Sequence, residues 1–157
     1  MIFRGKTYTL ERTQVIPKSR TDVFDFFSDA FNLQSITPAF LGFEILTPAP
    51  IDIQEGTLID YRITLFGFPM KWRTRIERFD PQKSFVDTQI RGPYTLWHHT
   101  HTFEDSPDGT LMRDIVLYRL PFGLLGTIAH SLFVRRTLQR IFQYRFDTLE
   151  KLLGGAR

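Results

Sequence analysis

The most informative segment of the chain is Gly92-Pro93-Tyr94-Thr95-Leu96-Trp97-His98-His99-Thr100-His101-Thr102-Phe103. Successive side chains of a strand point to opposite faces, so the odd-numbered residues from Trp97 to Phe103 share one face, two imidazoles among them. Turn residues stand on either side, with Gly92-Pro93 before the strand and Asp105 to Gly109 after it. Residues 84–91 and 110–120 are therefore predicted to be two further antiparallel strands that flank it.

Simple hairpin pairing predicts which side chains meet across this three-stranded unit. A one-residue slip would turn the whole set to the opposite face, so the register is part of the prediction. The predicted face carries aromatic groups beside imidazoles and carboxylates. The predicted pairs are His99 with Asp87, Trp97 with Gln89, His101 with Asp114, and Trp97 with Tyr118.

Earlier segments also show strand patterns. Residues 7–16 are predicted to form the first strand, with Tyr8, Leu10 and Val15 in the core. A short strand is expected at 43–46. Two longer segments then alternate with period two, which is typical of half-buried strands and brings the total to about seven. Their inward residues are Ile59, Tyr61, Ile63 and Leu65, followed by Met70, Trp72, Thr74 and Ile76.

Two short helices are predicted between the first two strands. Ser19 or Thr21 offers an oxygen for the N-cap, and Asp22 suits the positive end of the helix dipole. These helices should end near Thr37-Pro38, because a proline disfavours helical geometry in the residue before it.

A long helix is predicted from Phe122 to about Leu153 and should stop at Gly154-Gly155. About 30 residues of helix measure roughly 45 Å, so this helix must lie along the whole sheet. Its main apolar stripe, which is expected to face the sheet, consists of Leu125, Ile128, Leu132, Phe142, Phe146, Leu149 and Leu153.

Composition limits the class of protein. The chain has 157 residues, of which 42% are hydrophobic and 16 are phenylalanine, and this fits a single domain over residues 1–157. Crossing a bilayer takes about 20 consecutive apolar residues, so no stable membrane insertion is predicted. With no cysteine, disulfides and thiolate catalysis are excluded. The N-terminal residues lack a signal-peptide pattern, and the cytoplasm is the expected location.

The net charge of +3 and the pI near 9.4 raise the question of a nucleic-acid partner. No nucleic-acid motif accompanies the basic residues, so nucleic acid is not a predicted partner. An anionic ligand or a membrane surface would use the same charges. The basic residues fall on the solvated face of one strand, at Lys71, Arg73 and Arg75, and on the final helix, at Arg135, Arg136 and Arg140.

This α+β order, with its curved antiparallel sheet and terminal helix, resembles the helix-grip fold of the START-like superfamily, also called SRPBCC, over nearly the whole chain. The resemblance implies a deep cavity between sheet and C-terminal helix. Members of the superfamily bind lipids, hormones, quinones or polyketides, and only some are enzymes. The segments that are similar to its polyketide cyclase/dehydrase-like, ligand-binding branch are Gly92-Pro93-Tyr94, Trp97, His99, His101, Phe103, Asp108-Gly109-Thr110, Asp114, Tyr118 and Leu120-Pro121-Phe122-Gly123-Leu124-Leu125-Gly126.

Alternation and the resemblance together predict which residues bind a ligand. Aromatic side chains on the inner face of a sheet are usually part of a packed core. Here the predicted helices are too few to cover a seven-stranded sheet, so some of these side chains are expected to line a pocket. The predicted ligand-binding residues are Tyr61, Ile63, Trp72, Thr74, Phe85, Asp87, Gln89, Trp97, His99, His101, Asp114, Tyr118, Ile128 and Leu132.

The imidazoles and carboxylates permit three interpretations. In the first, they satisfy one another's hydrogen bonds in the core. In the second, His99 and His101, oriented by Asp87 and Asp114, move protons for a cyclase or dehydratase. The third is a metal site, but alternation sends His98 to the opposite face and no Cys is present, so neither a metal nor another cofactor is predicted.

Three classes of function follow from the sequence. The first is a protein that binds a hydrophobic or amphipathic small molecule of lipid, polyketide or aromatic type. The second is an enzyme of the polyketide cyclase or dehydratase type. The third is a protein- or membrane-interaction module that uses the basic terminal helix. The ligand and the oligomeric state are not specified by the residues.

Overall fold

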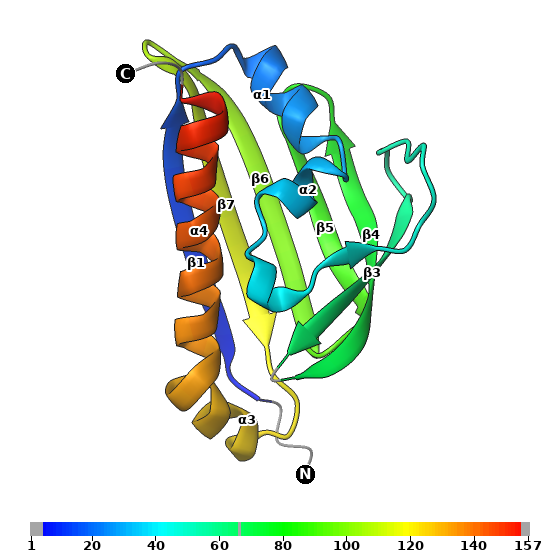
Figure 1. Ribbon diagram of the computed structural model, residues 1–157. Coiled ribbons are helices and arrows are strands. Elements are labelled where there is room, and N and C mark those ends of the chain that lie inside the picture. Colours follow the sequence, from blue (N-terminus) through cyan, green and yellow to red (C-terminus); the bar gives the residue numbers. More distant parts are fainter. Residues whose placement is uncertain (1–4, 66, 155–157) are drawn as a thin grey trace.

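The computed structural model describes residues 5–65 and 67–154. Its centre is a seven-stranded, curved antiparallel sheet in the order β1-β7-β6-β5-β4-β3-β2, which confirms the predicted helix-grip architecture (Figure 1). The first strand pairs with the last, so the sheet does not follow chain order. The strands are β1 (Thr7–Ile16), β2 (Glu44–Ile45), β3 (Leu58–Leu65), β4 (Phe68–Asp80), β5 (Ser84–Arg91), β6 (Leu96–Ser106) and β7 (Gly109–Arg119).

The helices all lie on one face of this sheet (Figure 1). The short ones follow β1 and cover β5 and β6, whereas the terminal helix runs beside β1 and β7. The helical elements are α1 (Arg20–Phe27), α2 (Asn32–Ser35), the 3-10 turn η1 (Ala39–Leu41), α3 (Leu124–Ala129), the π-helical segment η2 (His130–Val134) and α4 (Arg135–Leu153).

Local sequence explains how α1 begins. The Ser19 hydroxyl accepts a hydrogen bond from the Asp22 amide at 3.1 Å, as an N-cap does. The helix then buries Phe24 against Phe85 and Phe103, with ring centroids 6.2 Å and 5.3 Å apart. This aromatic cluster closes one end of the sheet.

One prediction for β1 is wrong. Val15 is 42% exposed, whereas its neighbours Gln14 and Ile16 are buried. The register gives the reason: Tyr8 lies opposite Tyr118 on β7, so the even-numbered residues of β1 share the inward face. Tyr8 and Leu10 do pack against the core.

The terminal helix contains an irregularity that the sequence did not reveal. α3, η2 and α4 follow one another without a break, but η2 is a π-helical segment. A π-turn holds an extra residue and therefore rotates the residues before it relative to those after it. Leu138, Phe142 and Leu149 face the sheet, in agreement with a helical stripe.

The first half of the predicted stripe does not face the sheet. Leu125, Ile128 and Leu132 are 71%, 48% and 58% exposed, because the π-turn changes their phase and α3 lies past the end of the strands (Figure 1). The helix stops at Gly154; Gly155 and residues 1–4 lie outside the described residues. Within the described part, no helix has both the length and the apolar character that a membrane crossing requires.

Candidate functional site

A cavity lies between the inner face of the sheet, the short helices and α4. It gives about 190 Å³ to the centres of water-sized molecules. One water needs roughly 10–15 Å³ on that measure, so there is space for on the order of a dozen waters or one organic molecule of similar bulk. The cavity touches three packed clusters, around Phe24, around Leu138 and around Ile59.

Aromatic side chains from β4, from β6 and from the loop before β6 form one wall. Trp72 meets Trp97 edge to face, with ring centroids 5.2 Å apart, and Tyr94 lies 4.9 Å from Trp97. The indole N–H of Trp72 donates to the Thr74 hydroxyl at 3.0 Å, so its polar atom is satisfied and the ring presents an apolar surface.

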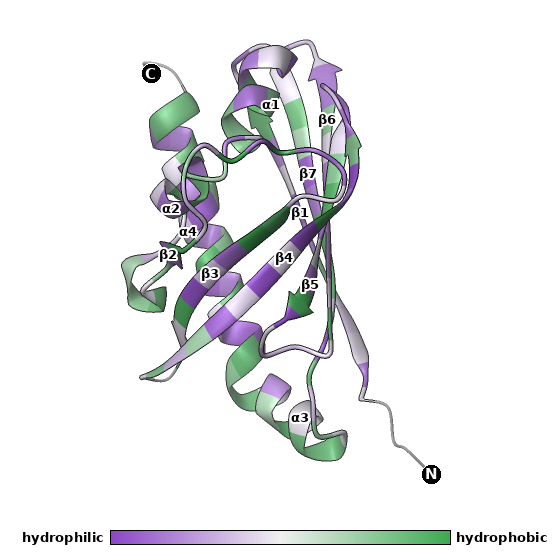
Figure 2. Ribbon diagram, turned by 90° about the vertical axis from the view of Figure 1, so that its right-hand side faces the viewer, coloured by the Kyte–Doolittle hydropathy of each residue, from purple (hydrophilic) through white to green (hydrophobic). Residues whose placement is uncertain are grey.

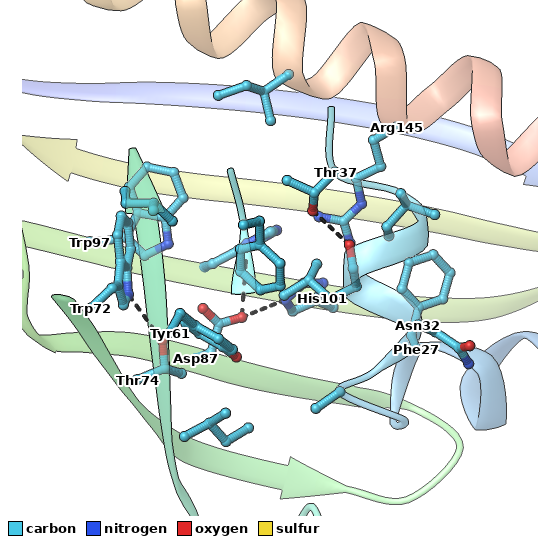
Figure 3. A pocket seen from close by; sticks show the side chains of 18 of the residues that line it. Phe27, Asn32, Thr37, Tyr61, Trp72, Thr74, Asp87, Trp97, His101 and Arg145 are labelled. Carbon is cyan, nitrogen blue, oxygen red and sulfur yellow. Dashed lines mark hydrogen bonds and ion pairs between the residues drawn. The ribbon is translucent and has the colours of Figure 1, made fainter. Parts of the chain in front are cut away.

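Two imidazoles and two carboxylates form the polar part of the site. The rings of His99 and His101 stack at 3.7 Å, and the carboxylates of Asp87 and Asp114 lie at opposite edges of this stack. His99 Nε2 is 2.8 Å from Asp114 Oδ1, and His101 Nε2 is 2.6 Å from Asp87 Oδ2. Both imidazoles are 4% exposed and Asp114 is buried as well, so the four groups form a buried network. Figure 3 shows two of them, Asp87 and His101, joined by their hydrogen bond.

The hydrogen bonds of this network run diagonally across the sheet. Backbone pairing places His99 opposite Asp87 and His101 opposite Asp114, as predicted. Each imidazole nevertheless makes its shorter contact with the other carboxylate. His99 Nδ1 is 3.8 Å from Asp87, and His101 Nδ1 is 3.1 Å from Asp114 without hydrogen-bond alignment.

Arg145 brings a cation to the same region from α4. It is 7% exposed, and its Nη2 lies 3.8 Å from Asp114 Oδ1. The guanidinium also lies over the rings of Phe27 and Phe142, at 5.3 Å and 5.7 Å from their centroids. Figure 3 shows Arg145 extending from the helix, with Trp72 and Trp97 on the far side of Asp87. The cavity thus has an aromatic end and a cationic end.

Burial and the contacts among these groups shift the pKa values of the two imidazoles in opposite directions. Burial lowers the pKa of His99, and the neighbouring His101 lowers it further, against the opposing effect of the carboxylates. Burial also acts to lower the pKa of His101, but its contacts with Asp114 and Asp87 outweigh this and leave that pKa raised. One of the two stacked rings is therefore favoured to carry the charge.

The carboxylates are favoured as anions. Burial alone would raise the pKa of Asp114, but Arg145 and the two imidazoles hold it well below its ordinary value. The pKa of Asp87 is lowered too, since the neighbouring His99 and His101 outweigh the burial that would raise it. Burial and the nearby Asp87 raise the pKa of Tyr61, so its hydroxyl stays protonated.

Asp87, His99 and His101 also form the kind of group that holds metals, because one ligand atom from each lies within 4.8 Å of the others. The details favour proton sharing over metal binding. The stacked rings direct their Nε2 atoms at separate carboxylates, whereas metal ligands converge on one point. The sequence-based expectation of no metal stays a prediction.

Nine of the predicted ligand-binding residues lie on the cavity wall and five do not. Asp114 lies behind the imidazoles and lines a small neighbouring cavity. The Tyr118 hydroxyl is 2.7 Å from His130 Nε2, beneath the helix. Ile128 and Leu132 are on the exposed part of the terminal helix. The nine on the wall are Tyr61, Ile63, Trp72, Thr74, Phe85, Asp87, Trp97, His99 and His101.

Gln89 is the fifth residue away from the wall, and its predicted pairing with Trp97 is wrong. The β5–β6 pairs end at Thr88 with His98. Beyond that point the side-chain amide of Gln89 bonds the backbone of Tyr94 twice. Its Nε2 donates to the Tyr94 carbonyl at 2.6 Å, and its Oε1 accepts from the Tyr94 backbone N–H at 3.0 Å. The Gln89 side chain therefore closes the loop at Gly92, where backbone hydrogen bonds between β5 and β6 have ended.

Sequence reasoning missed two parts of the site. Arg145 lies seven residues after Leu138 and three after Phe142, so helical spacing places it on the inward stripe; a charge at such a position was an available signal. The segment from α1 to η1 gave no comparable signal, because its apolar residues fit ordinary core packing. It supplies Phe26, Phe27, Ala30, Leu33, Ile36, Thr37 and Leu41 to the wall.

Comparison with protein families agrees with this geometry. The model of the family described as "Polyketide cyclase / dehydrase and lipid transport" matches residues 16–147. The chain belongs to this family. The match confirms the resemblance drawn from the Gly92–Gly126 segment, and it includes all the residues of the imidazole–carboxylate network. No protein of curated function matches the sequence.

Solved structures show the same fold at low identity. A Chromobacterium violaceum protein has a TM-score of 0.72 at 16% identity, covering 95% of this chain and 99% of that one. A Thermus thermophilus protein gives 0.70 at 17%, with 96% and 100% covered. Ginseng major latex-like protein 151 from Panax ginseng gives 0.67 at 13%, with 95% and 99% covered. These likenesses establish the architecture alone.

Proposed function

We propose that this protein binds one hydrophobic or amphipathic small molecule, of lipid, polyketide or aromatic type, in the cavity between sheet and α4. The observation that carries this proposal is the cavity itself, which stays open between three well-packed clusters. Protein interiors are normally close-packed, so a hollow of this size is a feature to be explained by an occupant. The family's description, which includes lipid transport, is consistent with it.

The lining favours a ligand that is mainly apolar. Most of the wall is aliphatic or aromatic, and the polar groups are few and concentrated near Asp87 and Arg145. Such a wall supplies affinity through apolar contact and orientation through a small number of polar contacts.

A second candidate function is acid–base catalysis, and Asp87 is the observation that favours it. Its side chain is 19% exposed and lines the cavity, while His101 bonds it from behind at 2.6 Å. A carboxylate held in this way can exchange a proton with a bound substrate, as a cyclisation or dehydration requires. The family description, which names cyclases and dehydrases, is consistent with this candidate as well.

Native mass spectrometry of freshly purified, untagged protein tests the proposal. We expect a fraction of the protein to carry one additional organic mass that is released on denaturation and extracts into organic solvent. Conversion of the released molecule when it is returned to the protein would favour the catalytic candidate; its unchanged return would favour binding alone. Protein that carries no such mass, and that takes up none from a lipid extract, would contradict both.

A further inference from the structure

Arg145 has hydrogen-bonding capacity that the protein does not use. Its Nε is buried and has no hydrogen-bond partner within the described residues. The nearest carboxylate oxygen, on Asp114, is 3.8 Å from Nη2, which is beyond hydrogen-bond reach. That same oxygen is already bonded to His99 at 2.8 Å. A buried donor without a partner is costly, so its retention on a cavity wall needs a reason.

The surroundings of Arg145 prepare it to receive a planar anion. Phe27 and Phe142 pack near the guanidinium and limit its movement. A guanidinium presents N–H donors in a fork that matches the two oxygens of a carboxylate. The two tryptophans lie away from it, across Asp87 (Figure 3). A ligand with an acidic head and an apolar body would satisfy both ends.

We infer that the ligand of this cavity carries a carboxylate or similar planar anion, which binds Arg145 while its apolar body lies against Trp72 and Trp97. This inference rests on the proposed binding function and narrows its ligand class. In this arrangement, Arg145 is the residue that makes the protein prefer an acidic ligand over a neutral ligand of the same size.

The charges around Arg145 add a second expectation. With one imidazole protonated, the network is neutral, because two carboxylates face two cations. An anionic ligand adds one negative charge to a buried site, which favours protonation of the second imidazole. Binding of an acid should therefore be accompanied by net proton uptake, of at most one proton per ligand. The titratable and charged groups of this region are Tyr61 on β3, Asp87 on β5, His99 and His101 on β6, Asp114 on β7 and Arg145 on α4.

The test compares 4-phenylbutanoate with 4-phenylbutan-1-ol, which differ only in the head group. We expect wild-type protein to bind the acid about tenfold or more tighter than the alcohol, as a charge-assisted hydrogen bond implies. Arg145→Met should bring the two affinities close to parity. Arg140→Met is the matched control, since Arg140 lies on the same helix over the exposed ring of Phe40, and it should keep the preference.

Folding of each variant is checked by circular dichroism and thermal unfolding. Should Arg145→Met fail to fold, Arg145→Lys keeps the charge without the fork and should lose part of the preference. Calorimetry of the wild type in two buffers of different ionisation enthalpy supplies an independent readout, with proton uptake expected for the acid and none for the alcohol.

Equal binding of acid and alcohol by the wild type, or an undiminished preference in folded Arg145→Met, would overturn the inference while leaving the proposed function intact. If neither compound binds, and the neutral fluorescent probe N-phenyl-1-naphthylamine does not bind either, the proposed function fails and this inference fails with it.

The first turns of the terminal helix expose several large apolar side chains. Phe122, Leu124 and Leu125 are 81%, 74% and 71% exposed, and Ile128 and Leu132 are exposed as well. We call these five residues the α3 tip. Figure 2 shows α3 as a hydrophobic element at one end of the molecule. Phe122 has a φ of 67°, a left-handed conformation that is unfavourable for a bulky residue. Contiguous exposed apolar patches are typical of interaction sites, and strained backbone is found most often at functional sites.

The charged residues that flank the α3 tip in the sequence are of one sign. Residues 115–146 contain no Asp or Glu, and their Arg residues are 119, 135, 136, 140 and 145. Arg119 donates to the Thr7 hydroxyl at 2.9 Å, beside Lys6. Burial lowers the pKa of the neighbouring His130, and Arg135 and Lys6 are close enough to lower it further. We propose that the α3 tip inserts its apolar side chains into the surface of a bilayer with anionic head groups.

Vesicle flotation tests this second proposal. Wild-type protein should float with phosphatidylcholine vesicles that contain phosphatidylglycerol, and much less with pure phosphatidylcholine or in high salt. Leu124→Ser combined with Leu125→Ser should abolish flotation, whereas Leu152→Ser, an exposed leucine at the other end of the helix, should not. Absence of flotation by the wild type would overturn the proposal. So would a concentration-dependent dimer that the double variant loses, because the tip would then contact a second copy.

Discussion

At the level of single residues, His99, His101, Asp87 and Asp114 are held together by hydrogen bonds that run diagonally across the sheet. Alternation along β6 placed both imidazoles inward, and hairpin pairing placed a carboxylate opposite each. The diagonal hydrogen bonds were not predictable, because backbone register fixes which Cα atoms face each other but not the direction in which long side chains lean. The outcome is a shared network in place of two separate pairs.

The raised pKa of His101 leads to a prediction about stability and pH. A base whose pKa is higher in the folded state than its ordinary value of 6.5 stabilises the fold below that pH. This contribution disappears as the pH rises through the folded-state pKa. His101→Gln should therefore cost about 1–3 kcal/mol near pH 6, and the difference from wild type should shrink at alkaline pH. Chemical denaturation across this range measures it.

His99 should show the opposite pH dependence, because its pKa is lowered by burial. Its neutral form stabilises the fold above pH 6.5, and that contribution is lost as the pH falls toward the folded-state value. His98→Gln is the control, since His98 is on the outer face of β6.

A His101→Gln penalty that stays constant from pH 6 to alkaline pH would contradict the assigned charge on His101.

At the scale of elements, strands were easier to predict than the terminal helix. Period-two alternation in β3 and β4 gave the inward residues correctly, because half-buried strands need that alternation. The helix has apolar residues on several faces between Phe122 and Phe133, so the stripe predicted there was only one of several that the pattern allows. The π-helical segment η2 then changed the phase, and this explains why Ile128 and Leu132 are away from the cavity.

Arg145 illustrates a different limit at this scale. Its place in the helical stripe follows from its spacing to Leu138 and Phe142, but a lone arginine in a basic helix is ordinarily a surface residue. Arg145 can point inward because it borders the cavity, where apolar side chains are not packed tightly against its charge. The sequence predicts the helix face, and the tertiary arrangement gives this residue its environment.

At the scale of the whole molecule, three packed clusters leave a cavity between the sheet, the short helices and α4. Local patterns predict a curved sheet with one long helix. From these elements it follows that the helices leave part of the inner sheet face uncovered. Local patterns do not predict how far the α1–η1 segment closes over the sheet, because its apolar residues would suit a filled core equally well. The size of the cavity is therefore a property of the assembled fold.

Binding of N-phenyl-1-naphthylamine to a variant with a filled cavity tests most directly whether this cavity is a ligand site. Ile63 is on the cavity wall, and Ile63→Trp should reduce affinity about tenfold or more, since a tenfold loss corresponds to only about 1.4 kcal/mol. Its melting temperature should hold or rise, because the larger ring fills empty space. Leu58→Trp, on the outward face of the same strand, should bind like the wild type. Equal binding by all three proteins would contradict a ligand site in this cavity.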